Sequence, residues 1–166
     1  MSVVACRVYD DRYEIAADSI SVRSYTQRKG DNTSASKLFE ENGVIVGAVG
    51  SCDEASLLRI FLMTHGIASD TEGAILEFMS EFAEWKKKRT EKAGIENAYI
   101  IGLGSCVFHA NGWFIEKIKT FEATGAGMDY ALAAMHMGHG VEEAVATAIE
   151  LSIYCEGPVQ RIVHTY

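Results

Sequence analysis

Apolar and polar residues at the start of the chain follow the pattern of two short strands joined by a tight turn. Successive residues of 2–8 face opposite sides of a strand, with apolar side chains on both sides. The charged residues 10–12 predict the turn, and residues 13–17 predict the returning strand. A hairpin this short brings Asp18, at the far end of the second strand, back level with the beginning of the chain.

The rest of the pattern predicts blocks of strands alternating with pairs of helices. Residues 43–49 are continuously apolar, as expected for a strand that is buried on both faces. An Asn-Gly pair at 111–112 lies between two apolar runs and predicts a hairpin turn, while apolar residues at helical spacing predict the helices. The expected strands are 34–39, 43–49, 97–103, 106–109, 113–117, 121–124 and 159–165, and the expected helices are 51–62, 70–94, 127–137 and 141–153.

Residues 19–32 are polar, and we interpret them as a loop or an edge strand with a turn at 29–31. The order of elements is therefore strands, two helices, strands, two helices and a final strand. Antiparallel hairpins with helices inserted in pairs predict an α+β fold in which two layers of sheet are covered by helices. We expect one domain, residues 1–166, because this length is sufficient for one hydrophobic core.

Composition and charge exclude several classes of function. Apolar residues make up 48% of the chain, but no run approaches the ~20 residues that a membrane span needs. The formal net charge of −8 argues against binding to nucleic acid, which needs a concentrated basic surface. The basic run at 86–89 has acidic neighbours, and we interpret it as the solvated end of a helix. Arg7 interrupts the apolar start, so the start is not a secretory signal and a cytoplasmic location is expected.

Metal and cofactor sites are not expected. The cysteines are scattered without a CxxC pair, so we expect them to be reduced and to bind no zinc. His136 and His139 stand three residues apart on a predicted helix without an acidic partner, and we interpret them as packing or surface residues. No GxxxxGKS/T motif is present, so any ATPase would be a separate chain. The four cysteines are Cys6, Cys52, Cys106 and Cys155.

Ser2 is a candidate nucleophile. It follows Met1, and an initiator methionine is normally removed when a small residue comes next. Ser2 would then carry a hydroxyl and a free α-amine on one residue, and an α-amine has a pKa of about 8. Such a residue is a nucleophile with its own base, and the predicted hairpin places the carboxylate of Asp18 across from it.

Five segments in a particular order extend over nearly the whole chain. They are Ser2, 15–18, 36–39, 44–51 and 123–131. Their order and spacing resemble the proteasome β-type peptidases and, more closely, the bacterial HslV peptidase, which are N-terminal-nucleophile hydrolases. No single segment is specific, and the resemblance depends on all of them together.

The resemblance implies a four-layer αββα sandwich and a peptidase that attacks the peptide carbonyl with its N-terminal residue. Ser2 falls on the nucleophile position, and Asp18 and Lys37 match the acid and the lysine of the family. The lysine lowers the proton affinity of the hydroxyl, and the aspartate holds the lysine in place. Gly50 matches the glycine whose backbone N–H serves the oxyanion hole, where a side chain would block the approach of the substrate.

The resemblance also implies an assembly that encloses its active sites. We expect a closed homo-oligomer, built as rings of six or seven subunits that can stack, which degrades peptides or unfolded proteins together with a separate AAA+ ATPase unfoldase. Two apolar helix faces are candidates for the contacts between subunits. They are the face of Leu57, Leu58, Phe61 and Leu62 and the face at residues 135–137.

Departures from the family leave other interpretations open. Proteasome subunits use threonine where this chain has Ser2, and their Gly-Ser-Gly before the third helix reads Gly-Ala-Gly here, at 125–127. The acid and the second serine expected after the fourth helix are not evident in residues 154–157, although Glu156 lies near the position. One alternative is therefore a catalytically silent proteasome-like ring or assembly subunit. A second is an amidase that acts on small molecules, since one fold can support several activities.

Overall fold

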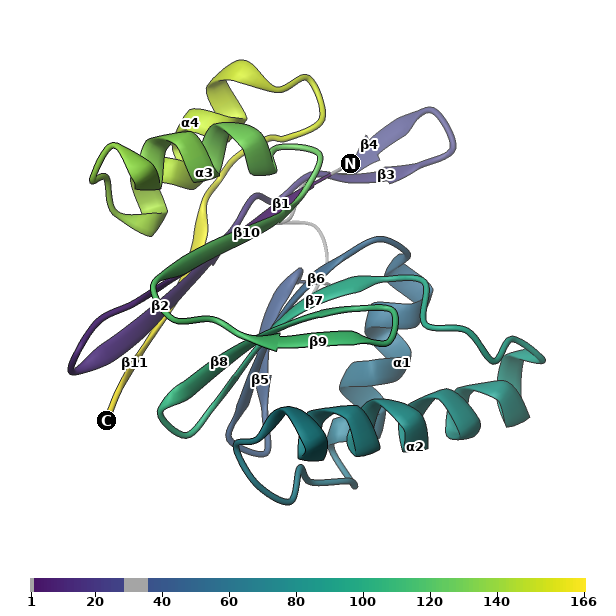
Figure 1. Ribbon diagram of the computed structural model, residues 1–166. Coiled ribbons are helices and arrows are strands. Elements are labelled where there is room, and N and C mark those ends of the chain that lie inside the picture. The colour runs from purple at the N-terminus through teal and green to yellow at the C-terminus, as the bar shows by residue number, and fades with distance from the viewer. Residues whose placement is uncertain (1, 29–35) are drawn as a thin grey trace.

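The computed structural model describes residues 2–28 and 36–166 and shows four layers (Figure 1). Two helices cover one sheet, two further helices cover the other, and the two sheets face each other in the middle. This is the αββα arrangement that the resemblance implies. The turn expected at 29–31 and the start of the strand expected at 34–39 lie outside the described residues.

The first sheet carries the N-terminal hairpin at its centre. Its strands are β1 (Val3–Val8), β2 (Arg12–Ala17), β10 (Phe121–Gly125) and β11 (Gln160–Thr165). They lie in the order β10-β1-β2-β11, and each neighbouring pair is antiparallel. Two helices cover its outer face (Figure 1). They are α3 (Met128–His136) and α4 (Val141–Leu151).

The second sheet is a meander of antiparallel strands in the order in which they occur along the chain. Its strands are β5 (Leu38–Glu41), β6 (Val44–Val49), β7 (Ala98–Leu103), β8 (Cys106–Asn111) and β9 (Phe114–Lys117). Two helices cover the outer face of this sheet (Figure 1). They are α1 (Cys52–Leu62) and α2 (Glu72–Thr90).

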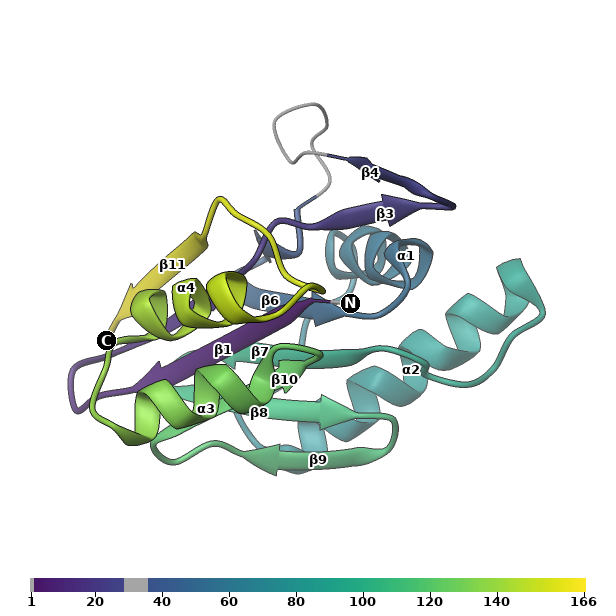
Figure 2. The same ribbon diagram turned by 90° about the horizontal axis from the view of Figure 1, so that it is seen from above.

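Residues 19–32, which we interpreted as a loop or an edge strand, contain a small hairpin that the sequence pattern did not predict. It consists of β3 (Ser21–Arg23) and β4 (Thr26–Arg28). Figure 2 shows this hairpin outside the two sheets, on the side of the molecule where the chain begins. Its residues are polar apart from Val22 and Tyr25, so no apolar alternation was available to predict it.

Alternation along β1 directs its side chains into two different cores, as the pattern predicts. Val3 and Ala5 pack under α3 and α4, whereas Val4 and Cys6 pack between the sheets. All four side chains are fully buried. The pairing of β1 with β2 places Asp18 opposite Val3, where the backbone N–H of Asp18 donates to the carbonyl oxygen of Val3 at 3.1 Å. The hairpin therefore returns Asp18 to the beginning of the chain, as expected.

The two sheets approach each other closely where β1 crosses β6. A Cβ atom at Gly47 would lie 2.4 Å from Cγ1 of Val4, so no side chain fits at this point. Ser2 precedes β1 and Gly50 follows β6, and the close crossing of these two strands places both residues at the same end of the sandwich.

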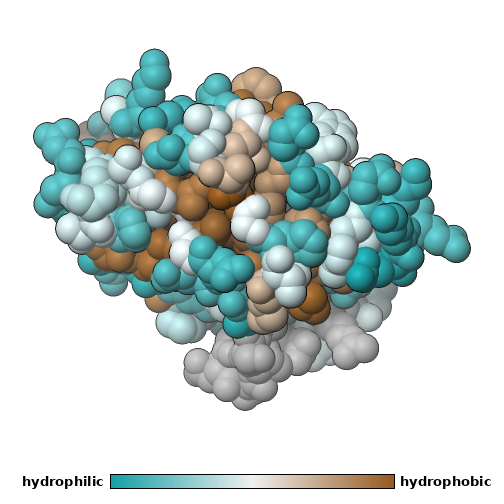
Figure 3. All heavy atoms as spheres, turned by 90° about the horizontal axis from the view of Figure 1, so that it is seen from below, coloured by the Kyte–Doolittle hydropathy of each residue, from teal (hydrophilic) through white to brown (hydrophobic). Residues whose placement is uncertain are grey.

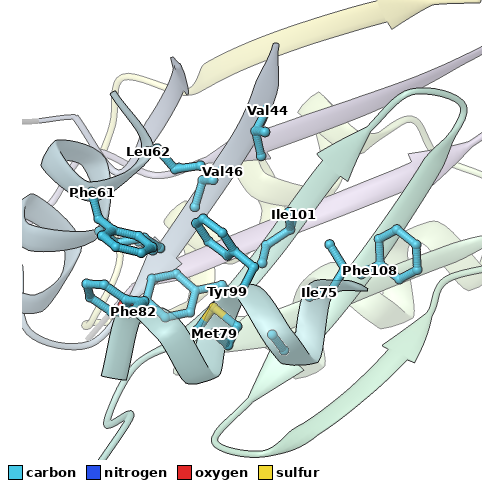
Figure 4. Close-up of a cluster of buried hydrophobic side chains, with 14 of the residues drawn as sticks. Val44, Val46, Phe61, Leu62, Ile75, Met79, Phe82, Tyr99, Ile101 and Phe108 are labelled. Atoms are coloured by element: carbon cyan, nitrogen blue, oxygen red, sulfur yellow. The ribbon is translucent and has the colours of Figure 1, made fainter. Parts of the chain in front are cut away.

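Aromatic side chains fill the layer between the second sheet and its two helices (Figure 4). The ring centroid of Phe61 on α1 lies 5.6 Å from that of Phe82 on α2, and Tyr99 of β7 packs into the same cluster. Within residues 2–28 and 36–166, no helix is both long enough and apolar enough to cross a membrane.

The prediction that the apolar face of α1 contacts other subunits is wrong for three of its four residues, while Leu57 is only partly buried. Leu58, Phe61 and Leu62 are at most 1% exposed and belong to the core of their own chain. Helical periodicity identifies an apolar face, but it does not show whether the same chain covers that face. The large apolar side chains exposed at this helix are Ile60 and Met63. Figure 3 views the molecule from the side of α1 and α2, where apolar residues gather in the middle and hydrophilic residues surround them.

The connection between α3 and α4 differs from prediction in two respects. Of the candidate contact face at 135–137, Met135 is buried in the core and Met137 is exposed. His139, which was expected to have no acidic partner, has its Nδ1 atom 3.4 Å from a carboxylate oxygen of Glu143. Both of these side chains are more than half exposed, so we interpret the contact as a weak surface ion pair.

One lysine of the predicted solvated helix end is instead buried. Lys86 is 3% exposed, and its ammonium group pairs with the carboxylate of Glu54 on α1, which is 4% exposed. Lys86 also donates to the carbonyl oxygen of Gly94. Burial alone would raise the pKa of Glu54, but hydrogen bonds from Lys86 and from the backbone amides of residues 96–97 outweigh it and lower that pKa.

Replacing Lys86 by methionine should lower the free energy of unfolding by about 3–5 kcal/mol, because the carboxylate of Glu54 would be buried without its cation. The folded-state pKa of Glu54 is lowered, so its stabilising contribution is present above the pKa of about 4.3 that it has when unfolded. That contribution is lost as the pH falls through the folded-state pKa. The cost of Lys86→Met should therefore shrink in acid, and urea unfolding at several pH values measures it.

Lys88→Met provides the matched control, because Lys88 is an exposed lysine on the same helix. Its effect should stay within about 0.5 kcal/mol. The double variant Glu54→Gln/Lys86→Met should regain part of the loss, since no charge is then left unpaired. Equal stability of the Lys86→Met and Lys88→Met proteins would contradict the structural role of the pair.

Candidate active site

A fully buried carboxylate, that of Asp18, forms the centre of the candidate site. Its Oδ1 atom accepts hydrogen bonds from the backbone N–H of Val3 at 2.9 Å and from the ammonium group of Lys37 at 2.7 Å. Its Oδ2 atom accepts from the backbone N–H groups of Ile20 at 3.1 Å and Glu156 at 3.2 Å. Segments that are far apart in the sequence therefore meet at one side chain.

These bonds tie the beginning of the chain to Lys37. Besides Lys37, the residue that donates to Oδ1 of Asp18 is Val3, the direct neighbour of Ser2. Ser2 is itself 3% exposed, and its carbonyl oxygen accepts a hydrogen bond from the backbone N–H of Gly127 at 3.2 Å. The main chain at Ser2 is thus held from both sides, by the hairpin and by the start of α3.

Lys37 lies just before β5 and extends the pairing of that strand with β6, since its carbonyl oxygen accepts from the backbone N–H of Ala48 at 2.8 Å. Its side chain is 17% exposed. Burial lowers the pKa of Lys37, and the charge and hydrogen bond of Asp18 oppose that shift without cancelling it. Lys37 therefore holds its proton less tightly than an exposed lysine does.

Three of the four predicted site residues line one cavity of about 310 Å³. Ser2, Lys37 and Gly50 lie on its wall, and Asp18 lies beneath it, bonded to Lys37. Among the described residues that line this cavity there is no carboxylate, whereas two basic side chains, those of Lys37 and Arg59, face it. The structure thus brings all four predicted residues together, three on the cavity wall and one behind it.

Gly50 has a backbone conformation that favours glycine, with φ at +132°. A Cβ atom at this position would lie 2.2 Å from Oδ1 of Asn97, so a side chain would collide with Asn97. The predicted reason for glycine here was the approach of a substrate to the backbone. The structure adds a second reason: the side-chain amide of Asn97 occupies the space that a side chain at residue 50 would need.

Asn97 is a residue at the site that sequence reasoning missed. Its Oδ1 atom accepts from the backbone N–H of Ser51 at 2.6 Å, and its Nδ2 atom donates to the carbonyl oxygen of the same residue at 2.9 Å. In the sequence, Asn97 is only the first residue of a predicted strand, and no motif marks it.

The segment after α4 contacts the site through its backbone. The N–H of Glu156 donates to Asp18, and the carbonyl oxygen of Glu156 accepts from the N–H of Ser19 at 2.8 Å. The carboxylate of Glu156 instead bonds Gln27 of the β3–β4 hairpin. The side chain of Glu156 therefore does not occupy the position of an acid in the site, although its backbone does contribute to it.

Cys155 is buried next to these residues. A Cβ atom at Gly127 would lie 2.7 Å from its sulfur atom. Burial raises the pKa of the Cys155 thiol, the charge of Asp18 raises it further, and a hydrogen bond with Ser152 and the charge of Lys37 partly oppose this. The thiol is therefore kept protonated and is not an activated nucleophile. Within the part of the chain that the structure describes, no group of three side chains could hold a metal ion.

Comparison with known proteins identifies the fold. No model of a known protein family matches the sequence, and no curated protein matches it either. Among solved structures, the chain is similar to BPH of Thiobacillus denitrificans, with a TM-score of 0.88, 20% identity, and 98% of this chain and 97% of that chain covered. A second structure of BPH, in complex with epoxomicin, has a TM-score of 0.88 and 19% identity, with 98% of each chain covered.

The eukaryotic HslV from Trypanosoma brucei is also similar, with a TM-score of 0.73 and 18% identity over 99% of each chain. At such identities the likeness concerns the fold. The chain therefore has the four-layer αββα fold of the HslV-like and proteasome-like N-terminal-nucleophile hydrolases, which is the fold that the resemblance in sequence implies.

Proposed function

We propose that this chain is a peptidase subunit of the proteasome/HslV type, in which Ser2 acts as the nucleophile once removal of Met1 frees its α-amine. One observation carries the proposal: a single buried carboxylate oxygen, Oδ1 of Asp18, binds both the ammonium group of Lys37 and the backbone next to Ser2. A lysine with a lowered pKa and the buried Ser2 thereby line the same cavity, both connected through Asp18.

In the proposed reaction, the hydroxyl oxygen of Ser2 attacks the carbonyl carbon of a peptide bond, and the α-amine of Ser2 accepts the hydroxyl proton. The charge of Lys37 lowers the proton affinity of the hydroxyl, and the backbone N–H of Gly50 stabilises the oxyanion. The C–N bond then breaks, and the amine returns the proton to the leaving nitrogen. Water hydrolyses the remaining ester by the same route in reverse, which regenerates Ser2.

Substrates are proposed to be peptides and unfolded polypeptides. Among the described residues that line the cavity, five are apolar and six are serines. The apolar residues are Ile20, Val22, Phe39, Ala48 and Ala55. An apolar wall of this kind favours a small or medium-sized apolar side chain next to the cleaved bond. We further propose that the chain works in the cytoplasm as a closed ring, with a separate ATPase that unfolds its substrates.

A silent subunit of a proteasome-like ring is the second candidate function. Two observations favour it: Ala126 supplies no hydroxyl beside the start of α3, and the carboxylate of Glu156 is directed to Gln27 instead of the cavity. Both remove polar groups that would assist the N-terminal amine. The removal of Met1 and the reactivity of Ser2 separate the two candidates.

The first test measures the intact mass of the protein and its reaction with a peptide epoxyketone. The ketone and epoxide carbons of this probe can react with the hydroxyl and the α-amine of one N-terminal residue. We expect a mass without Met1 and one added probe per chain. Hydrolysis of peptides should be lost in Ser2→Ala and kept in Ser2→Thr. While Met1 remains, the nitrogen of Ser2 is an amide and not a base, which should cost ~10²–10⁴-fold in rate. Complete retention of Met1 would leave the fold intact and favour the silent subunit.

The second test concerns Lys37 and pH. Lys37→Ala should lower kcat/KM by ~10²–10³-fold, because the site loses its fixed positive charge. In the unaltered protein, kcat/KM should rise as the α-amine loses its proton near pH 8 and fall as Lys37 loses its own. Since the pKa of Lys37 is lowered, the falling limb should lie below the ordinary value of about 10.4. Lys37→Ala with unchanged turnover would remove Lys37 from the mechanism.

The third test concerns assembly. A peptidase that hides its active sites needs a closed oligomer, and we expect sedimentation at micromolar concentration to show a species of at least six 18.2 kDa chains. The exposed Ile60, Met63 and Met137 are candidate contacts. Replacing Met63 or Met137 by aspartate should weaken the oligomer if that residue lies at an interface. A monomer at all concentrations would contradict the ring.

A further inference from the structure

A connected set of buried polar side chains lies behind Gly50, and the proposed mechanism does not use it. The ammonium group of Lys86 binds Glu54, and the carboxylate of Glu54 accepts from the backbone N–H of Asn97 at 2.9 Å. The hydroxyl of Tyr99 donates to the same carboxylate at 3.0 Å. Each of these four residues is at most 4% exposed, so water does not compete for these bonds.

The side chain of Asn97 connects this set to the loop that follows β6. Its amide bonds both the N–H and the carbonyl oxygen of Ser51. The amide accepts one of these bonds and donates the other, which fixes the peptide groups on both sides of Ser51. Strand pairing holds the other side of the loop, since Val49 pairs with Ala98 of β7. Gly50 therefore lies between Val49, which is held by strand pairing, and the N–H of Ser51, which is held by Asn97. Together these two contacts determine the direction of the Gly50 N–H.

Contact with Asn97 also explains why residue 50 is a glycine. The Oδ1 atom of Asn97 occupies the space that a Cβ atom at Gly50 would need, so the amide side chain packs directly against the glycine. With φ at +132°, Gly50 has access to a range of conformations that other residues lack. A residue with that freedom needs an external restraint if its N–H is to keep one direction.

We propose that Asn97 is a positioning residue for the oxyanion hole, and that Glu54, neutralised by Lys86, orients Asn97 for this purpose. Asn97 acts through Ser51 and Gly50 and is not itself on the reaction path. The inference rests on the proposed role of the Gly50 N–H. Because an error of about 1 Å in the position of a catalytic group can cost ~10²-fold in rate, a restraint on this loop is kinetically important.

Asn97→Asp is the sharpest variant, because aspartate has the same shape but replaces the donor to the Ser51 carbonyl by a carboxylate oxygen, which repels that carbonyl. Asn42→Asp is the control for the same change at a more exposed asparagine. Asn42 also donates from Nδ2 to a backbone carbonyl, that of Leu62 at 2.6 Å, but it does not line the cavity. We expect Asn97→Asp to lower kcat by ~10²-fold with KM changed less than ~3-fold, while Asn42→Asp keeps both. Thermal unfolding of both variants provides the check that they are folded.

Amide hydrogen exchange tests the restraint without any enzyme activity. Ser51 is the N-cap of α1, and a backbone N–H at this position has no partner within the helix. Its protection from exchange should therefore come from Asn97 alone. We expect a protected Ser51 N–H in the unaltered protein and in Asn42→Asp, and loss of that protection in Asn97→Ala.

These measurements separate the inference from the proposed function. A Ser51 N–H that exchanges freely in the unaltered protein, or equally in Asn97→Ala and Asn42→Asp, would overturn the inference whatever the activity. An active protein in which Asn97→Asp and Asn42→Asp have the same kcat would also overturn it. A protein that hydrolyses no peptide, yet loses Ser51 protection in Asn97→Ala, would retain the restraint and count against the peptidase.

Discussion

The buried carboxylate of Asp18 is the constraint on which the candidate site depends. A carboxylate without contact to water is tolerated only when it is paired and hydrogen-bonded. Asp18 meets this condition through the ammonium group of Lys37 and three backbone amides, those of Val3, Ile20 and Glu156. The chain must therefore bring its first strand, the start of β5 and the segment after α4 together. The contacts that make Asp18 tolerable also bring Lys37 and Ser2 to the wall of one cavity, so folding and site geometry share one requirement.

A second buried carboxylate, that of Glu54, supports another part of the cavity wall from behind. Glu54 accepts hydrogen bonds from Lys86 and from the backbone that carries Asn97, and Asn97 in turn holds Ser51. One anion thus lies under the proposed nucleophile and the other behind the proposed oxyanion donor. In both cases the charge is neutralised by one buried or half-buried lysine. Rigid positions for catalytic groups are expected from such fully satisfied networks.

Backbone contacts explain how the site can retain its form where the sequence departs from the family. The acid and serine expected after the fourth helix are not evident, yet the N–H of Glu156 still binds Asp18. Any residue except proline can supply that bond, so it does not depend on the side chain. The fold is likewise shared with solved structures at 18–20% identity, because apolar alternation can be kept while most individual residues change.

The sequence by itself determined most of the elements and, through the resemblance, the four layers and the candidates Ser2, Asp18, Lys37 and Gly50. These features depend on alternation, helical spacing and the order of short segments, all of which can be read along the chain. Only the tertiary structure decided which apolar faces are buried, as at α1, and which polar residues meet. Ser51 and Asn97 are 46 residues apart, and Glu54 and Lys86 are 32 apart. Contacts of that kind depend on how whole elements cross, and no local pattern records that.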